Sequence, residues 1–281
     1  MIRIVSDSTC DLSQSLIEKY DISIIPLCIT LGEDTYLDGI DVSPEEIYKW
    51  SDEHKTTPKT SAVPFDKIES TLTPMIEAGD DIIFIGISEE MSSTCNRVRI
   101  FGEDTGYGRI FVINSKNLST GIGLQVLRAA ELRDAGKSAE EVVSEIEGAR
   151  DLVRASFVVD TLTFLARGGR CTAVTALMAN ALKLHPEIVV KDGKMGVGRK
   201  VRGKPAVAVM AYVDGLIPAL QKADTRRVFI THSGSDRETL DAVRERLAAL
   251  GRFDEILETR AGGVISSHCG PNTLGVLFYE V

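Results

Sequence analysis

Short apolar runs alternate with longer amphipathic stretches through the first half of the chain. The apolar runs have the length of strands, and helical spacing with capping signals predicts helices between them. Unbroken apolar strands separated by amphipathic helices indicate a parallel sheet with helices on both faces. The pattern therefore predicts an N-terminal Rossmann-like α/β domain. We expect strands at residues 2–5, 22–31, 82–87 and 110–113 and helices at residues 65–78, 95–101, 118–135 and 141–153, with two more beginning at Asp11 and Ser43 as N-caps.

The alternation is looser in the second half, where long apolar helical stretches separate short strands. This half is predicted to form a second α/β domain with a mixed sheet. No linker rich in Pro, Gly or Ser marks the junction, so the two domains, residues 1–153 and 154–281, are expected to be closely joined. The expected strands are residues 157–159, 188–190, 228–231, 256–259 and 276–279, and the expected helices are residues 174–184, 206–220 and 238–250.

Composition narrows the possible functions. The 281 residues are 43% apolar, which is enough for a substantial core, and the net charge is −9. An acidic chain without a basic block is poorly suited to bind a phosphate backbone, so no nucleic acid partner is expected.

The N-terminal residues contain no apolar run of signal-peptide length, and the longest apolar stretches fall short of the roughly 20 residues that span a bilayer. The five cysteines include no C-x-x-C pair, and the four histidines show no metal-ligand spacing. We therefore expect a cytoplasmic, reduced protein without a metal, a cofactor or stable membrane insertion.

Three polar loops contain most of the candidate binding groups of the N-terminal half. Hydroxyls and backbone N–H groups at helix starts can bind anions, but the same residues also cap helices. Capping is the favoured interpretation for Asp11, whereas for Ser8 and Thr9 the two interpretations are balanced. Loops that follow strands of one parallel sheet converge on its carboxyl edge, which favours a shared binding site. The three loops are residues 6–12, 60–64 and 88–96.

Two further clusters lie in the C-terminal half. In residues 160–170 a double glycine stands between Arg167 and Arg170, and in residues 262–272 three glycines and a proline surround His268. The second cluster predicts a constrained turn, with no helix, around a histidine. There is no P-loop and no G-x-S-x-G motif, and a catalytic triad is possible but unsupported.

Together these clusters resemble the DegV family of bacterial lipid-binding proteins over essentially the whole chain. Five motifs occur in the family's order and at matching intervals: S-D-S-x-x-D-L at residues 6–12, T-S at residues 60–61, S-G-T at residues 92–94, D-T-L-x-x-L-x-R-G-G-R at residues 160–170 and H-x-G-P at residues 268–271. The match departs from the family at Ser93, which replaces a glycine, at the position of Pro64, and at Asn114 and Asn272.

The resemblance implies a two-domain protein, without enzymatic activity of its own, that holds one long-chain fatty acid. The acyl chain would be buried in the C-terminal domain and the carboxylate would lie at the domain junction. Thr60 and Ser92 would hydrogen-bond the carboxylate, with Ser61, Thr94 and His268 nearby. Arg170 would lie at the mouth of the site, where a separate fatty acid kinase subunit would approach to form acyl phosphate for phospholipid synthesis.

The residue types agree with this expectation, because a buried carboxylate needs several donors and a buried acyl chain needs apolar walls. Two alternatives remain: an acyl-transfer enzyme that uses Ser92 with His268 as its base, and a binder of phosphorylated metabolites. The apolar side chains that are candidates for the wall of the tunnel are Leu162, Phe164, Leu165, Leu177, Met178, Leu182 and Leu184.

Overall fold

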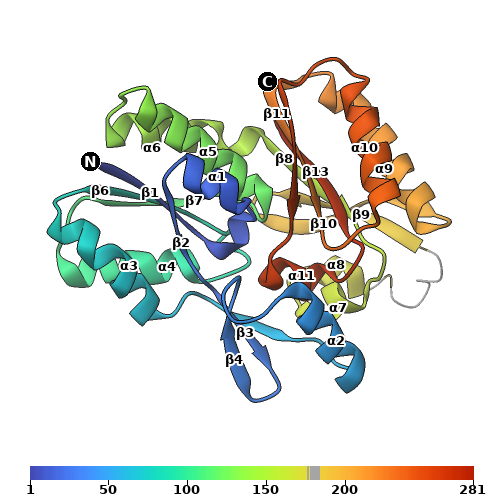
Figure 1. Ribbon diagram of the computed structural model, residues 1–281, viewed down its shortest axis with the longest axis horizontal. Helices are drawn as coiled ribbons and strands as arrows, with labels where there is room; N and C mark the ends of the chain where they lie inside the picture. Colours follow the sequence, from blue (N-terminus) through green and yellow to red (C-terminus); the bar gives the residue numbers. More distant parts are fainter. Residues whose placement is uncertain (176, 178–183) are drawn as a thin grey trace.

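The computed structural model describes residues 1–175, 177 and 184–281. The N-terminal half is built on a parallel four-stranded sheet with the strand order β2-β1-β6-β7 (Figure 1). Apolar side chains alternate along β6: Ile82 and Phe84 face one side, and Ile83 and Ile85 face the other. The predicted parallel sheet is confirmed. Its strands are β1 (Ile2–Asp7), β2 (Ile22–Ile25), β6 (Asp81–Gly86) and β7 (Ile110–Asn114).

Helices cover both faces of this sheet, as the amphipathic pattern predicts. The face with Phe84 packs against α3 (Phe65–Glu77) and α4 (Thr94–Thr105). The opposite face packs against α5 (Thr120–Asp134) and α6 (Ala139–Ala149). Two shorter elements follow β1: η1 (Ser8–Cys10) and α1 (Gln14–Lys19).

The C-terminal half is built on a six-stranded sheet with the order β10-β9-β8-β13-β11-β12, in which only β11 and β12 pair in parallel. One face packs against α9 (Pro205–Leu220) and α10 (Arg237–Ala248). The predicted fold, two α/β units with a mixed second sheet, is confirmed. The strands are β8 (Val153–Val158), β9 (Leu184–Lys191), β10 (Lys194–Arg202), β11 (Ala223–His232), β12 (Glu255–Arg260) and β13 (Leu274–Glu280).

Helix α5 lies between the two sheets and is buried on nearly all sides. Ten of its fifteen residues are buried, and it packs in one core with Phe157 and Leu277 of the C-terminal sheet. At Gly123 the helix passes so close to the loop after β1 that a Cβ would lie 2.9 Å from the carbonyl oxygen of Cys10. Because this core is continuous across the halves, the division at residues 153 and 154 stays a prediction, although β8 does begin at Val153.

One predicted strand is wrong: residues 22–31 form two strands, and the second of them belongs to a third sheet. The apolar run at residues 22–31 is divided at Pro26, which cannot donate a backbone hydrogen bond, and Leu27, whose N–H is bonded to Ser8 Oγ. The second part pairs in an antiparallel sheet of order β4-β3-β5, at the bottom of Figure 1. Its strands are β3 (Cys28–Leu31), β4 (Asp34–Leu37) and β5 (Lys59–Ser61), and α2 (Pro44–His54) begins with the predicted capping box of Ser43 and Glu46.

Element ends also differ from the expectation in the middle of the chain. Helix α6 ends at Ala149, because the chain passes through η2 (Arg150–Leu152) into β8. Of the predicted helix at residues 174–184, residues 176 and 178–183 lie outside the described part, α8 (Thr172–Thr175) covers the start, and Leu184 already belongs to β9. Within the described residues no helix has the length and apolar character needed to cross a membrane.

Candidate functional site

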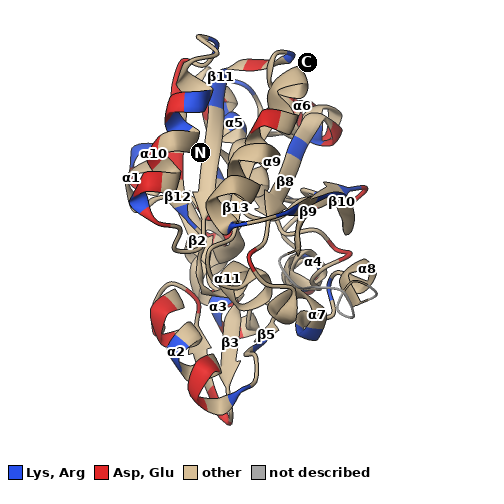
Figure 2. Ribbon diagram, turned by 90° about the vertical axis from the view of Figure 1, so that its right-hand side faces the viewer, with Lys and Arg blue, Asp and Glu red and all other residues tan. Residues whose placement is uncertain are grey.

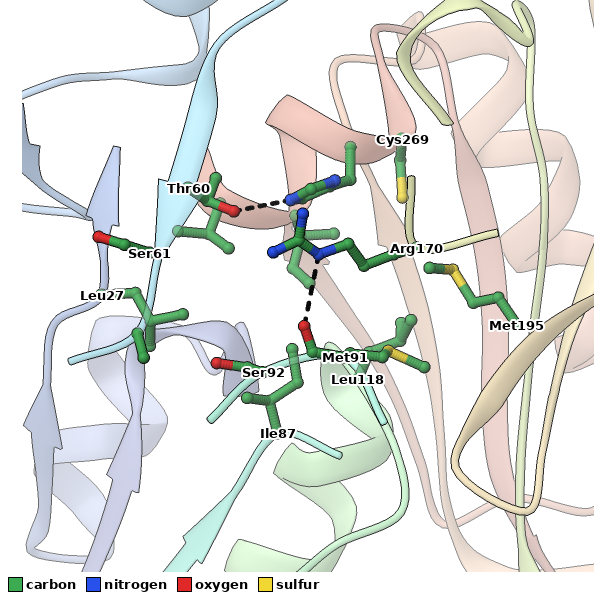
Figure 3. A pocket seen from close by; sticks show the side chains of 14 residues that line it. Leu27, Thr60, Ser61, Ile87, Met91, Ser92, Leu118, Arg170, Met195 and Cys269 are labelled. Carbon is green, nitrogen blue, oxygen red and sulfur yellow. Dashed lines mark hydrogen bonds between the residues drawn. The ribbon is translucent and has the colours of Figure 1, made fainter. Parts of the chain in front are cut away.

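A small cavity of about 40 Å³ lies where the two halves meet (Figure 3). It is next to the carboxyl end of β6, beside β1, the place where open α/β sheets bind ligands because the chain leaves these strands in opposite directions. Segments from the whole length of the chain contribute to it. The lining residues are Leu27, Thr60, Ser61, Ala62, Ile87, Met91, Ser92, Leu118, Arg170, Met195, Val264, Ile265, His268 and Cys269.

The hydroxyl and imidazole groups of the cavity come from three separate segments of the chain. Thr60 Oγ1 on β5 and His268 Nε2 are 2.8 Å apart, and Ser61 follows on the same strand. Ser92 Oγ, in the loop between β6 and α4, is 2.9 Å from Thr94 Oγ1. The structure thus brings Thr60, Ser61, Ser92 and His268 to one cavity, as the motifs predict. Thr94 is buried behind Ser92 and contacts the cavity only through it.

The prediction that His268 sits in a turn is wrong. His268 lies in the last turn of α11 (Gly263–Cys269), which follows β12 directly. The glycines that suggest a turn serve close packing at the start of this helix: a Cβ on Gly263 would lie 2.6 Å from Ile29 Cδ1. The helix is short, and four of its residues line the cavity: Val264, Ile265, His268 and Cys269.

The His268 ring is neutral and packed against the backbone. Burial, and then the nearby charge of Arg170, lower its pKa to about 4. A Cβ on Gly168 would lie 2.3 Å from His268 Nδ1, so glycine is required at that position. Nδ1 is buried and has no hydrogen-bond partner among the residues that the structure describes. Because an unpaired N–H costs more than an unpaired lone pair, we infer that the proton is on Nε2 and is donated to Thr60 Oγ1. The Thr60 O–H is then free to donate into the cavity.

Arg170 is exposed and follows α7 (Thr163–Gly168) at the edge of the cavity. Its Nε donates to the carbonyl oxygen of Met91 at 3.4 Å and its Nη1 to that of Gly168 at 3.0 Å. In Figure 3 its side chain extends toward the space between Thr60 and Ser92. A structural role through Asp160 is not supported, since Asp160 lies beside His185, 3.6 Å away.

The apolar wall continues into a second, smaller cavity of about 20 Å³. The two cavities share Leu118, Ile265 and Cys269, so these side chains separate them. The second cavity lies between α11, the residues just before α5 and the six-stranded sheet, where Phe157 and Leu277 line it.

Of the predicted tunnel residues, Met178 and Leu182 lie outside the described residues. The described ones (Leu162, Phe164, Leu165, Leu177 and Leu184) line neither cavity. Leu162 and Leu165 belong to the core that spans both halves, and the Phe164 ring lies edge-on to Tyr48.

The first polar loop, residues 6–12, has a different role from the one expected. Asp11 does not cap α1, which begins at Gln14 after Ser13. Its backbone is left-handed, with a φ of 51°, and its carboxylate accepts hydrogen bonds from Gly262 N–H and Ser119 Oγ. Ser8 donates to Asp38 at 2.8 Å. The loop therefore contacts the start of α11, and no ligand-facing role is assigned to Thr9, which donates to Asp7.

Asp38 is a residue that the sequence reasoning missed. Its side chain is buried, and Oδ1 accepts from the N–H groups of Gly263 at 2.7 Å and Val264 at 3.3 Å. Nothing in the sequence around Leu37 marks it, because its partners are more than 220 residues away.

Two departures from the family pattern are accommodated by the backbone. Ser93 has a φ of −83°, an ordinary value for any residue, so the loss of glycine there imposes no strain. Asn272 has a φ of +56°, a left-handed conformation that asparagine tolerates better than most residues. The loops at Ser92 and after His268 therefore keep regular geometry.

The described residues do not form a serine–histidine–acid triad. His268 Nε2 is paired with Thr60, Ser92 Oγ is paired with Thr94, and Nδ1 of His268 has no acceptor to orient the ring. In the described part of the chain, no group of three or more His, Cys, Asp or Glu side chains is arranged to hold a metal ion. The five cysteines are buried free thiols.

The fold and the cavity define a class: two α/β units around a mostly apolar cavity with hydroxyl groups at one side. The family model described as "Uncharacterised protein, DegV family" matches residues 1–281. The chain belongs to the DegV family. It is 30% identical over 279 residues to a DegV domain-containing protein of Clostridium acetobutylicum, which covers 99% of this chain and 98% of the relative.

Solved structures of the family share the fold. A fatty-acid-binding DegV family protein from Thermus thermophilus has a TM-score of 0.91 and 30% identity, covering 100% of this chain and 99% of that one. A stearic acid-binding protein from Eubacterium ventriosum has a TM-score of 0.85 and 27% identity, covering 100% and 98%.

Because Asp11 is buried between the halves, we expect stability to depend on pH. Burial raises its pKa to about 8 despite its bonds to Ser119 and Gly262. Between pH 4 and pH 8 the folded protein then binds more protons than the unfolded chain, so the free energy of unfolding falls as pH rises. Asp11→Asn should remove this contribution. Between pH 5 and pH 8 the free energy of unfolding of the variant should therefore fall by at least about 1.4 kcal/mol less than that of the wild type. Urea unfolding at both pH values measures it; equal losses in the two proteins contradict the assignment.

Proposed function

We propose that this protein binds one long-chain fatty acid, with the carboxylate at the hydroxyl groups of the junction cavity and the acyl chain along its apolar wall. The observation that carries the proposal is the division of this cavity. Thr60, Ser92 and His268 gather at one side, and the remaining wall, which continues past Leu118 and Ile265, is almost entirely apolar. Such a combination fits an amphiphile with one small anionic head.

The head group would be held mainly by neutral donors. A carboxylate moved out of water needs compensating hydrogen bonds, and those from hydroxyl groups to a charged acceptor are among the stronger ones. The Thr60 O–H is available because His268 donates to its oxygen, and Ser92 lies across the cavity. Arg170 adds a positive charge from the solvent side.

The acyl chain would supply most of the affinity. Each buried methylene contributes about 0.8 kcal/mol, so a sixteen-carbon chain gains on the order of 10 kcal/mol before ordering costs. In this structure both cavities, of about 40 Å³ and 20 Å³, are too small to hold an acyl chain, and Leu118, Ile265 and Cys269 separate them. We propose that the chain passes between these side chains toward Phe157, and that they move aside to admit it.

The two alternative functions fit the site less well. A phosphorylated metabolite would place its polar atoms against Ile87, Met91, Met195 and Val264, which offer no donors. An acyl-transfer enzyme would need His268 as a base for Ser92, but the ring is bonded to Thr60 and burial keeps its pKa near 4, too low for an effective base at neutral pH. The related proteins from Thermus thermophilus and Eubacterium ventriosum, described as binding fatty acid and stearic acid, support the carrier function.

We further propose that the bound carboxylate is presented to a separate kinase for acyl phosphate formation, with Arg170 facing that partner. Arg170 is exposed at the cavity edge. The chain is acidic overall, but Figure 2 shows basic residues on β10, the strand that contributes Met195 to the cavity wall. Local positive charge would help a phosphoryl donor approach a carboxylate on a protein of net charge −9.

Mass spectrometry of an organic extract of the purified protein tests the function directly. We expect one equivalent of a long-chain fatty acid from protein expressed in a lipid-rich host. Protein whose cavity contains only water or a phosphorylated compound, and which takes up no fatty acid after delipidation, would contradict the proposal.

Ser92→Ala should weaken fatty acid binding without unfolding the protein. Loss of one donor to a buried carboxylate costs roughly 1.5–3 kcal/mol, about ten- to a hundredfold in affinity. Thr60→Val should have a similar effect. Ser93→Ala is the matched control, because the Ser93 side chain is exposed and makes no capping bond. Titration of delipidated proteins with labelled fatty acid gives the affinities. A Ser92→Ala protein that binds normally but no longer hydrolyses an acyl ester would instead support the enzyme.

Arg170→Ala should leave the amount of copurified fatty acid nearly unchanged and reduce acyl phosphate formation with a cognate kinase and ATP at least tenfold, if its contact with the partner contributes about 1.4 kcal/mol. Arg167→Ala is the control, since Arg167 is exposed on α7 and does not line the cavity. A lowered melting temperature together with lost lipid would show that Arg170 is structural, through its bonds to Met91 and Gly168.

A further inference from the structure

The geometry of the head-group site depends on where α11 lies. His268 is on α11 and its partner Thr60 is on β5, which belongs to the three-stranded sheet of the N-terminal half. Thr60 and His268 are 208 positions apart in the sequence, so the local chain does not hold them together. Their 2.8 Å contact therefore requires that α11 be fixed against the N-terminal half by other interactions.

Asp38 fixes the start of α11 from the N-terminal half. Its Oδ1 accepts from the N–H groups of Gly263 and Val264, the first two residues of the helix. Its Oδ2 accepts from Ser8 Oγ, which in turn accepts from Leu27 N–H at 3.1 Å. The Asp38 side chain is almost fully buried, with 3% of the residue exposed. Both carboxylate oxygens of Asp38 thus accept hydrogen bonds, and these bonds fix the position of the side chain.

Asp11 makes a second contact one residue earlier, where its Oδ1 accepts from Gly262 N–H at 2.8 Å. The helix is also pressed against β3, as a Cβ on Gly263 would meet Ile29 Cδ1 at 2.6 Å. With its first turn held at three consecutive N–H groups, α11 has little freedom to shift or rotate. His268 is five residues after Gly263, about 7.5 Å along a rigid helix.

We propose that Asp38, assisted by Asp11, is a positioning residue of the fatty acid site: by holding the start of α11 it sets the His268–Thr60 contact and so aims the Thr60 O–H at the bound carboxylate. The inference rests on the proposed function. Asp38 does not line the junction cavity, so any effect on binding acts through α11.

A double-mutant cycle with His268 separates this role from general stability. Asp38→Ala should weaken fatty acid binding to delipidated protein about fivefold, the size of one neutral hydrogen bond. In the His268→Ala background the same change should have almost no further effect, because the group that it positions is absent. Asp38→Asn keeps an oxygen acceptor for Gly263 and Val264 and should restore most of the affinity. An equal loss of affinity in both backgrounds would overturn the proposal.

Asp80→Ala is the matched control. Asp80 is also a buried carboxylate of the N-terminal half, but it pairs with Arg3 and the N-terminal amine, away from the cavity. The Asp80→Ala substitution should lower the melting temperature and leave the affinity for fatty acid unchanged. If Asp80→Ala weakens binding as much as Asp38→Ala does, the effect is loss of stability and the proposal fails. Should Asp38→Ala not fold, Ser8→Ala, which frees one oxygen of Asp38, replaces it and should weaken binding in the same direction.

The nitrogen NMR spectrum of labelled His268 gives a readout independent of affinity. In the wild type Nε2 should show the shift of a protonated nitrogen in a hydrogen bond, and in Asp38→Ala this signal should move toward that of a free neutral ring. An unchanged His268 spectrum in Asp38→Ala contradicts the proposal. Failure of the proposed function is distinguishable, because wild-type protein would then bind no fatty acid while the His268 spectra still differed.

Discussion

The attachment of α11 to the N-terminal half is the interaction on which the site depends. Two buried carboxylates, Asp11 and Asp38, accept hydrogen bonds from the first N–H groups of a helix that lies more than 220 residues further along the chain. These N–H groups have no partners within the helix, so the contacts satisfy them while joining the halves. Burial raises the pKa of both acids, which shows that the arrangement is costly. It is nevertheless what places His268 beside Thr60.

Helix α5 provides the second connection between the halves, and it is apolar. Its two sides pack against different sheets, so residues such as Ile122 and Leu127 belong to a core that also contains Phe157 and Leu277. The second cavity borders this core, since Phe157 and Leu277 also line the cavity. An acyl chain that entered it would replace contacts between side chains with equivalent contacts to lipid, which is why a region so central to stability can also accept an apolar ligand.

The head-group side of the cavity relies on neutral donors, with its charge at the rim. His268 is kept neutral by burial and by Arg170, and it polarises Thr60 without forming an ion pair. A permanent buried cation would hold a carboxylate more tightly, but it would also be costly in the empty protein. Hydroxyl donors avoid that cost, and with Arg170 exposed at the rim a carboxylate bound in the cavity would stay accessible from the solvent side.

The sequence by itself determined the alternation of strands and helices, because burial on both faces of a parallel sheet leaves a local apolar pattern, and it marked Thr60, Ser61, Ser92, His268 and Arg170 through motifs. It did not reveal that the run at residues 22–31 divides at Pro26, that His268 lies on a helix, or that Asp11 and Asp38 hold that helix. Each of these depends on partners far away in the chain. A glycine-rich segment becomes a helix when distant carboxylates satisfy its first N–H groups, and a polar loop becomes an anchor only once the helix that it binds has folded against it. Local pattern fixes what a segment can form, and long-range contacts decide which possibility is stable.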